Sequence, residues 1–199
     1  YNLKIISDSA QSIASKYMGK YCATIGDIGG ISLNCHKHIQ TGEGGVLFTN
    51  DDKIAYKLRL IRNHGEQVFN SKKKKKLTNI IGFNFRMGEI EAAIGIEQLK
   101  KLKKIIKKKT DSVKRLSKGL SSLKGLILPS IDYGCTHSYY VFAMKIDEKI
   151  TGIHRDKIHM ALEAEGLRIA KNYQSLHLLE VFKNRMGFGK KNFPWSLSK

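Results

Sequence analysis

The residues best suited to chemistry lie in the first 45 positions, around Lys37. This lysine follows a short apolar run and precedes three glycines, Gly42, Gly44 and Gly45. Glycines without side chains let a backbone approach a ligand closely. A lysine amine that has lost its proton is a nucleophile and a base. Taken by itself, Lys37 could equally be one of the many surface lysines of this chain.

Two further polar residues lie at or near the ends of short apolar runs. Asp8 ends the run from Leu3 to Ser7, and Ser32 lies in the run from Gly29 to Leu33. Ligand sites of α/β proteins gather at the carboxyl ends of parallel strands, and a serine hydroxyl can bind a phosphate. The alternatives are an aspartate in a turn or helix cap and a buried serine bonded to backbone.

The pattern around these residues resembles the DegT/DnrJ/EryC1/StrS family of pyridoxal-phosphate (PLP) sugar aminotransferases. The first matching block consists of Asp8-Ser9-Ala10-Gln11, Gly26-Asp27, Ser32, Lys37 and Thr41-Gly42-Glu43-Gly44-Gly45. The second consists of Gly82-Phe83-Asn84-Phe85-Arg86-Met87, Glu91-Ala92-Ala93-Ile94-Gly95 and Gln98-Leu99. A looser third match is His137-Ser138-Tyr139-Tyr140, with the later Tyr173 and His177.

The resemblance implies a role for each matching polar residue. Lys37 would hold the cofactor aldehyde as a Schiff base and move the proton during the reaction. Asp8 would keep the pyridine nitrogen protonated, so that the ring withdraws electrons. Gln11 would contact the ring substituents and Ser32 the phosphate, whereas Asn84 would reach the phosphate in a neighbouring subunit. The alternative for Gln11 is a residue in the first turn of a helix, and for Asn84 a turn residue.

Some relatives in this family are dehydratases that carry histidine in place of the lysine. His36 and His38 flank Lys37, so the register decides between the two activities. Counting from Ser32 and from Thr41 arrives at Lys37 both times, which favours transamination. A regulatory relative and a basic binding protein without catalysis remain as alternative functions.

The family reaction transfers an amino group, usually from glutamate, to the keto group of a nucleotide-linked sugar, in amino-sugar biosynthesis for surface polysaccharide or similar glycoconjugates. We therefore expect PLP as cofactor, glutamate and a nucleotide-linked keto sugar as substrates, and a homodimer with shared sites. The implied fold is that of fold-type-I PLP aminotransferases. Family members have a long segment before the Asp8 box and continue beyond the last residue here, so we expect an internal piece of such an enzyme, inactive by itself.

Composition limits the other classes of function. Lys and Arg number 36 against 17 Asp and Glu, a net charge of +19. The basic residues are not interleaved with aromatic ones as in single-strand binders, so we expect no nucleic-acid partner. No apolar run is long enough to span a membrane. The three cysteines show no paired spacing, which indicates neither a disulfide framework nor a zinc site and is typical of a reducing, cytoplasmic setting.

The elements that must position these residues follow from the periodicity. The first third predicts a buried parallel strand at 3–7, strands at 29–33 and 46–49, and a helix after Asn50-Asp51-Asp52 that ends at His64-Gly65. Residues 66–80 predict a Lys-rich loop. Apolar spacing from Met87 predicts a long helix ended by Gly125. Beyond it we expect strands at 139–146 and 167–170 and a helix at 155–165.

These elements predict three parts of the chain. Residues 1–86 would be the C-terminal part of the large α/β domain. Residues 87–124 would be the connecting helix, and residues 125–199 part of a small α+β domain. Lys37 and the other candidate site residues fall in the first part.

Overall fold

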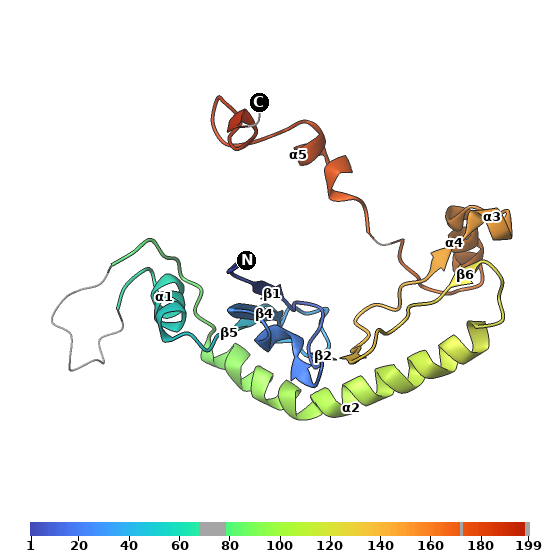
Figure 1. The fold of residues 1–199 in the computed structure, drawn as a ribbon, viewed down its shortest axis with the longest axis horizontal. Helices are drawn as coiled ribbons and strands as arrows, with labels where there is room; N and C mark the ends of the chain where they lie inside the picture. The colour runs from blue at the N-terminus through green and yellow to red at the C-terminus, as the bar shows by residue number, and fades with distance from the viewer. Residues whose placement is uncertain (68–78, 172, 198–199) are drawn as a thin grey trace. The chain divides into compact units, whose positions relative to one another are not determined.

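The computed structural model describes residues 1–67, 79–171 and 173–197 (Figure 1). The chain forms two compact units. The first comprises Tyr1–Leu123 and Leu128–Lys145, and the second comprises Lys124–Ile127 and Ile146–Lys199. Most of the Lys-rich loop predicted at 66–80 lies outside the described residues.

The main sheet of the first unit has three strands in the order β1 (Ile6–Asp8), β4 (Ile28–Ser32) and β5 (Gly45–Phe48). Strand β1 runs parallel to β4, and β5 runs antiparallel to it. The three strands coincide with the three predicted in this part of the chain, within a few residues at each end. The sheet therefore places the carboxyl ends of β1 and β4 at the same edge.

The prediction that the first strand is buried is wrong for this chain. Leu3 is 77% exposed and Ile6 is 78% exposed. Strand β1 lies at the edge of the sheet, so within the described residues only β4 pairs with it. An apolar run thus predicted the strand correctly but not its burial, because burial depends on what covers the strand.

A second small sheet was not predicted. Its strands lie in the order β3 (Lys20–Tyr21), β2 (Lys16–Tyr17) and β7 (Cys135–Thr136), all antiparallel. Met18 and Gly19, both at positive φ, form the two-residue turn between β2 and β3. Pairing of β2 with β7 brings two segments together that are more than 100 residues apart in sequence.

Helix α1 (Asp52–Arg62) follows the predicted cap signal. The side chain of Asp51 accepts hydrogen bonds from the backbone N–H groups of Lys53 and Ile54, at 2.7 and 3.1 Å. These two donors have no partner inside the helix, which is why Asp at this position stabilises it. The chain leaves the helix through Gly65, at a φ of +78°.

Helix α2 (Glu89–Leu120) spans 32 residues in the segment where apolar spacing predicts a helix. It ends five residues before Gly125, the predicted stop. Leu123 N–H bonds to the carbonyl of Leu120 and closes a final turn. Gly125, at a φ of +79°, instead serves the tight turn before the next strand.

The hydrophobic core of the first unit includes residues on both sides of Lys37 in the sequence. Ile13, Leu33 and Ile39 are buried together, and Leu102 and Ile105 of α2 pack against them. Two of the three core residues flank the candidate lysine. Burial of these side chains therefore fixes both ends of the segment in which Lys37 lies.

The second unit is built of short elements: β6 (Leu126–Ile127), the end of β8 (Lys145–Ile146), α3 (Glu148–Thr151), α4 (Arg155–Ala164), α5 (Glu180–Lys183) and the 3-10 turns η2 (Leu176–Leu178) and η3 (Trp195–Leu197). In the first unit, η1 (Cys22–Thr24) is a similar short turn. Strands β6 and β8 form a two-stranded sheet. The helix predicted at 155–165 is confirmed as α4.

Two strand predictions near and in this unit are wrong. Of residues 139–146, only Lys145–Ile146 are in a strand, and residues 167–170 form none. The backbone of Leu167 donates to Leu162, and His159 Nε2 lies 3.1 Å from the Ile169 carbonyl. The backbone groups after α4 therefore bond to that helix and not to a neighbouring strand.

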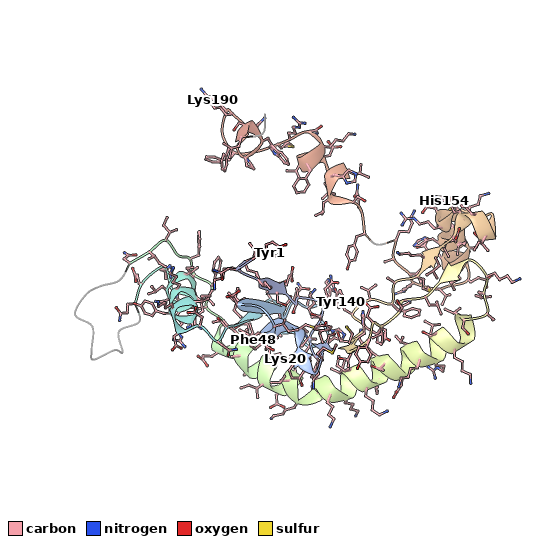
Figure 2. All side chains as sticks on the ribbon, viewed as in Figure 1. Tyr1, Lys20, Phe48, Tyr140, His154 and Lys190 are labelled. Carbon is pink, nitrogen blue, oxygen red and sulfur yellow. The ribbon has the colours of Figure 1, made fainter. Side chains whose placement is uncertain are left out.

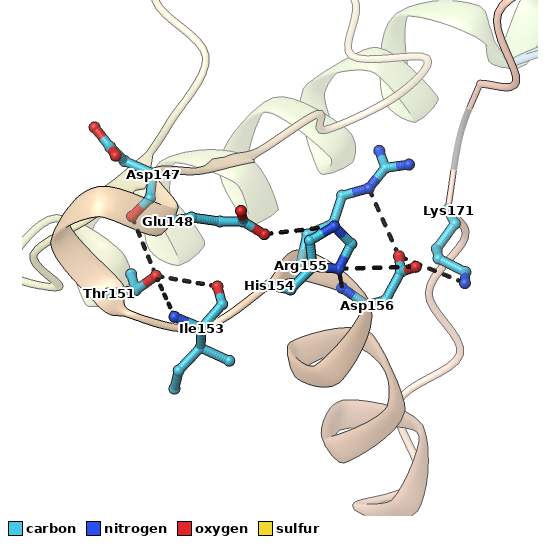
Figure 3. Close-up of polar contacts among 8 residues, drawn as sticks. All are labelled: Asp147, Glu148, Thr151, Ile153, His154, Arg155, Asp156 and Lys171. Carbon is cyan, nitrogen blue, oxygen red and sulfur yellow. Dashed lines mark hydrogen bonds and ion pairs between the residues drawn. The ribbon is translucent and has the colours of Figure 1, made fainter.

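Charged side chains surround the start of α4 (Figure 3). His154 caps this helix, since its Nδ1 accepts from Asp156 N–H at 3.2 Å. Glu148 lies 3.4 Å from His154, and Lys171 lies 3.5 Å from Asp156. These side chains are largely exposed, so each ion pair contributes little to stability.

Among the helices of the described residues, none combines the length and apolar content needed to cross a membrane. Within the same residues, no three His, Cys, Asp or Glu side chains are grouped so that they could hold a metal ion.

Candidate functional site

Asp8 and Ser32 end two neighbouring parallel strands. Asp8 pairs in register with Gly30, and Ser32 lies two residues further along β4. The exposed carboxylate of Asp8 accepts one hydrogen bond from Ala10 N–H at 3.1 Å. The hydroxyl of Ser32 accepts from Asn34 N–H at 3.2 Å. One edge of the sheet therefore carries both a carboxylate and a hydroxyl.

The loop after β4 is closed by three backbone hydrogen bonds. Leu33 N–H donates to Gly44 at 2.8 Å, and Thr41 N–H donates back to Leu33 at 2.9 Å. Within this loop, Lys37 N–H donates to Asn34 at 2.9 Å. The backbone at Lys37 is therefore held in a turn of defined shape.

The residues from Thr41 to Gly45 form a turn that is held by side-chain contacts. Asn34 Nδ2 donates to the Glu43 carboxylate at 2.7 Å, and the Thr41 hydroxyl donates to the Glu43 carbonyl at 2.8 Å. A side chain at Gly44, which has a φ of +156°, would lie 2.7 Å from the Thr41 hydroxyl oxygen. The Thr-Gly-Glu-Gly-Gly pattern thus builds the turn that holds the lysine loop.

The amine of Lys37 lies over an aromatic ring. Its Nζ is 4.4 Å from the ring centroid of Tyr140, within the range of a cation–π interaction. Both side chains are half-buried. Tyr140 lies in the segment after β7 (Figure 2). The pairing of β2 with β7 therefore brings its ring to the lysine loop.

His38 contacts the backbone of Ser138, whereas its neighbour Lys37 contacts the ring of Tyr140. Its Nε2 donates to the carbonyl of Ser138 at 2.8 Å, and the side chain is buried. Burial lowers the pKa of His38 below its usual 6.5; the hydrogen bond to Ser138 opposes this, and the positive charges of Lys109 and Lys37 add to it. The imidazole is therefore neutral near pH 7 and is already engaged with backbone.

Asn84 lies on the segment between α1 and α2. It forms an isolated bridge with Asn63 at the end of α1, and its Oδ1 accepts from Arg86 N–H at 3.5 Å. Among the described residues, no hydrogen bond or ion pair links Asn84 to Lys37 or Asp8. Gln11 lies in the exposed turn that follows Asp8 and is not in a helix. The chain thus places Asp8 and Ser32 at one edge of the main sheet and Lys37 in the loop that leaves this edge, while Asn84 lies on the segment between α1 and α2.

Sequence reasoning missed the hydrogen bonds that join the segment after Asp8 to the segment after β7. Ser15 Oγ bonds to both Oγ and N–H of Ser138, at 3.0 and 3.1 Å. From the sequence, Tyr140 and Ser138 belong only to a loose motif that predicts no contact. The one signal for these contacts was the motif His137-Ser138-Tyr139-Tyr140. A single sequence does not reveal which residues, more than 100 positions away, such a motif contacts.

The model of the DegT/DnrJ/EryC1/StrS aminotransferase family matches residues 1–198. The chain belongs to this family. It is 31% identical over 200 residues to the uncharacterized protein MJ1066 of Methanocaldococcus jannaschii, covering 98% of this chain and 52% of that protein. It is 29% identical over 183 residues to GDP-perosamine synthase of Caulobacter vibrioides, covering 92% and 48%.

A solved structure gives the same answer for the fold. The aminotransferase TlmJ of Streptoalloteichus hindustanus superposes with a TM-score of 0.78 at 27% identity, over 90% of this chain and 47% of that one. The predicted fold class, that of fold-type-I aminotransferases, is confirmed. The chain spans about half the length of the curated relatives it matches.

Proposed function

We propose that the full-length protein is a PLP-dependent aminotransferase that transfers an amino group from glutamate to the keto group of a nucleotide-linked sugar. The observation that carries this proposal is the placement of Asp8 and Ser32 at one edge of the main sheet, with Lys37 in the loop that follows Ser32, in a chain of this family. The similarity to GDP-perosamine synthase supports a nucleotide-linked sugar as the acceptor.

The side chains at this edge fit the polar groups of PLP. The cofactor has a pyridine nitrogen, a phosphate and an aldehyde. A carboxylate such as Asp8 suits the first, a hydroxyl such as Ser32 the second, and an amine such as Lys37 the third. When bound, PLP withdraws electrons from the carbon that bears the amine. Asp8 and Ser32 would hold the two ends, and Gln11, in the turn after Asp8, would contact the ring substituents.

Lys37 is the group that would move the proton. It lies in a turn fixed by Asn34 and by the two bonds of Leu33, so its amine swings from a defined backbone position. A neutral Nζ accepts a proton from the amino-bearing carbon of glutamate. The neighbouring His38 does not compete for this role, because it is buried and donates to the Ser138 carbonyl. This supports amino transfer over the dehydratase alternative.

We further propose a homodimer in which Asn84 serves the phosphate of the partner's cofactor. The family resemblance implies this role, and among the described residues no hydrogen bond or ion pair links Asn84 to Lys37. We place the enzyme in the cytoplasm, where free cysteines stay reduced; Cys22, Cys35 and Cys135 are all unpaired here.

Borohydride reduction tests the assignment. The full-length protein is loaded with PLP, reduced and digested, and the pyridoxyl group is located by mass spectrometry. We expect it on Lys37 and expect Lys37→Arg to lose it. Glutamate added to the unreduced protein should release 2-oxoglutarate in an amount equal to the bound PLP. A pyridoxyl group on a different lysine, in a protein that releases 2-oxoglutarate, would overturn the assignment of Lys37.

A further inference from the structure

The contact between Lys37 and Tyr140 involves a ring whose position is set by its neighbours. Ser138, two residues earlier, is 1% exposed and bonds to Ser15 and His38. Tyr139 adopts a φ of +53°, an uncommon conformation for a tyrosine. Such a conformation persists where the surroundings determine it strongly.

His137 makes two contacts with Tyr139. Tyr139 N–H donates to His137 Nδ1 at 2.8 Å, and the two rings stack with centroids 4.5 Å apart. The ring of Tyr140 also lies 5.9 Å from that of His38. The segment therefore presents the Tyr140 ring to the lysine loop in one orientation.

We propose that Tyr140 is a positioning residue for Lys37, whose ammonium is held on the ring face until the amine is used. The proposal rests on the proposed function of Lys37. A ring face attracts the cation and not the neutral amine. Tyr140 thus holds the side chain of Lys37 in one position and slows the reaction of its amine with electrophiles.

A second pair in the chain provides a matched control. Lys16 Nζ lies 4.6 Å from the ring centroid of Tyr21, its cross-strand partner in the β2–β3 hairpin. The geometry resembles that of Lys37 and Tyr140, but Tyr21 is 52% exposed. Because the two pairs share no residue, substitution of one ring should change the reactivity of its own lysine only.

The test measures the acetylation rate of each lysine by mass spectrometry, in the full-length protein after any bound PLP has been removed. In Tyr140→Leu the rate at Lys37 should rise about three- to tenfold, which corresponds to loss of one cation–π contact. In Tyr140→Phe it should stay near the original rate, because the ring face is retained. In both variants Lys16 should be unchanged, and Tyr21→Leu should affect Lys16 alone.

A second series removes the charge attraction without changing the packing. Phenylalanines with one, two and three fluorine atoms at position 140 keep the ring shape but weaken its negative face. The acetylation rate of Lys37 should rise stepwise with fluorine number. This series keeps the proposal testable even where Tyr140→Leu loosens the fold.

Equal rates at Lys37 throughout the fluorinated series would overturn the proposal, as would equal rates in Tyr140→Leu and the unaltered protein. These measurements contain no cofactor. A failure here is therefore separate from a failure of the proposed function, which would appear as a pyridoxyl group on another lysine after borohydride reduction.

Discussion

The Nε2 atom of His38 lies 2.8 Å from the carbonyl oxygen of Ser138, a residue 100 positions further along the chain. This bond joins the lysine loop to the segment after β7. Among the described residues, Nδ1 of the same ring is buried without a hydrogen-bond partner. Protonation of Nδ1 would therefore create a buried donor with no acceptor, next to the positive charges of Lys37 and Lys109.

The first prediction concerns the pH dependence of stability. Because the folded-state pKa of His38 lies below its usual 6.5, the unfolded chain binds a proton that the folded chain does not. The unfolding free energy should therefore be greatest above about pH 7 and should fall as the pH drops through 6.5 toward the folded-state pKa. Urea unfolding of the full-length protein between pH 5 and 8 measures this slope.

Two variants separate His38 from the other histidines. His38→Asn keeps an N–H donor for Ser138 but cannot titrate, so its slope between pH 7 and 5 should be shallower. His154→Asn is the control, because His154 is largely exposed and lies beside Glu148. A slope that is the same in His38→Asn and in the unaltered protein would show that another group causes the pH dependence.

The second prediction concerns the buried pair of serines. Ser15→Ala removes the acceptor of Ser138 N–H and the partner of its hydroxyl, in a place where both residues are buried. Leaving a buried donor without a partner costs about 1–3 kcal/mol. Urea unfolding should show a loss of this size. Ser121→Ala, at the exposed end of α2, should change stability by less than about 0.5 kcal/mol.

The lysine loop shows what one sequence could predict. The short apolar runs predicted the strands of the main sheet correctly, because that signal is local. The spacing between Ser32, Lys37 and Thr41 is local too, and the choice of Lys37 that rests on it stays a prediction. The strand predicted at residues 139–146 failed for the opposite reason. Its apolar and aromatic residues pack as separate contacts, such as Tyr140 on Lys37, and those contacts depend on the pairing of β2 with β7. A pattern along one segment carries no information on such a partner.

The same limit applies to burial and to the end of α2. The run before Asp8 has the composition of a buried strand, yet Ile6 is exposed, because neighbouring strands decide burial. Gly125 was the nearest glycine to the end of the helical pattern, but the helix stops at Leu120. Glycine tolerates a positive φ in any turn, so its position alone does not mark the end of a helix.

The third prediction compares two glycines. A Cβ atom at Gly29, in the middle of β4, would lie 1.9 Å from the carbonyl oxygen of Ala23. Gly29→Ala should therefore push the central strand away from η1 and destabilise the protein by about 1–3 kcal/mol or more. A Cβ at Gly119, in α2, would meet no atom within 4 Å, so Gly119→Ala should stabilise by about 0.5 kcal/mol. Thermal unfolding measures both changes, and equal effects would contradict the close approach of β4 to Ala23.

The last prediction tests the shared site of the proposed dimer. Lys37→Ala and Asn84→Ala should each lower amino transfer, the first to background. After subunit exchange in an equal mixture, half of the dimers contain one chain of each kind. If Lys37 and Asn84 serve the same site from different chains, each mixed dimer has one intact site, and activity should recover to about a quarter of the unaltered level.

The mixture distinguishes this arrangement from one in which both residues serve a site within one chain. In that case every site of a mixed dimer lacks one of the two residues, and mixing restores nothing. Exchange is followed with differently tagged chains, so that an absence of recovery is interpretable. The mean activity of the two single variants, each measured unmixed, provides the baseline. Proven exchange with activity at that baseline would show that Asn84 does not complete the partner's site.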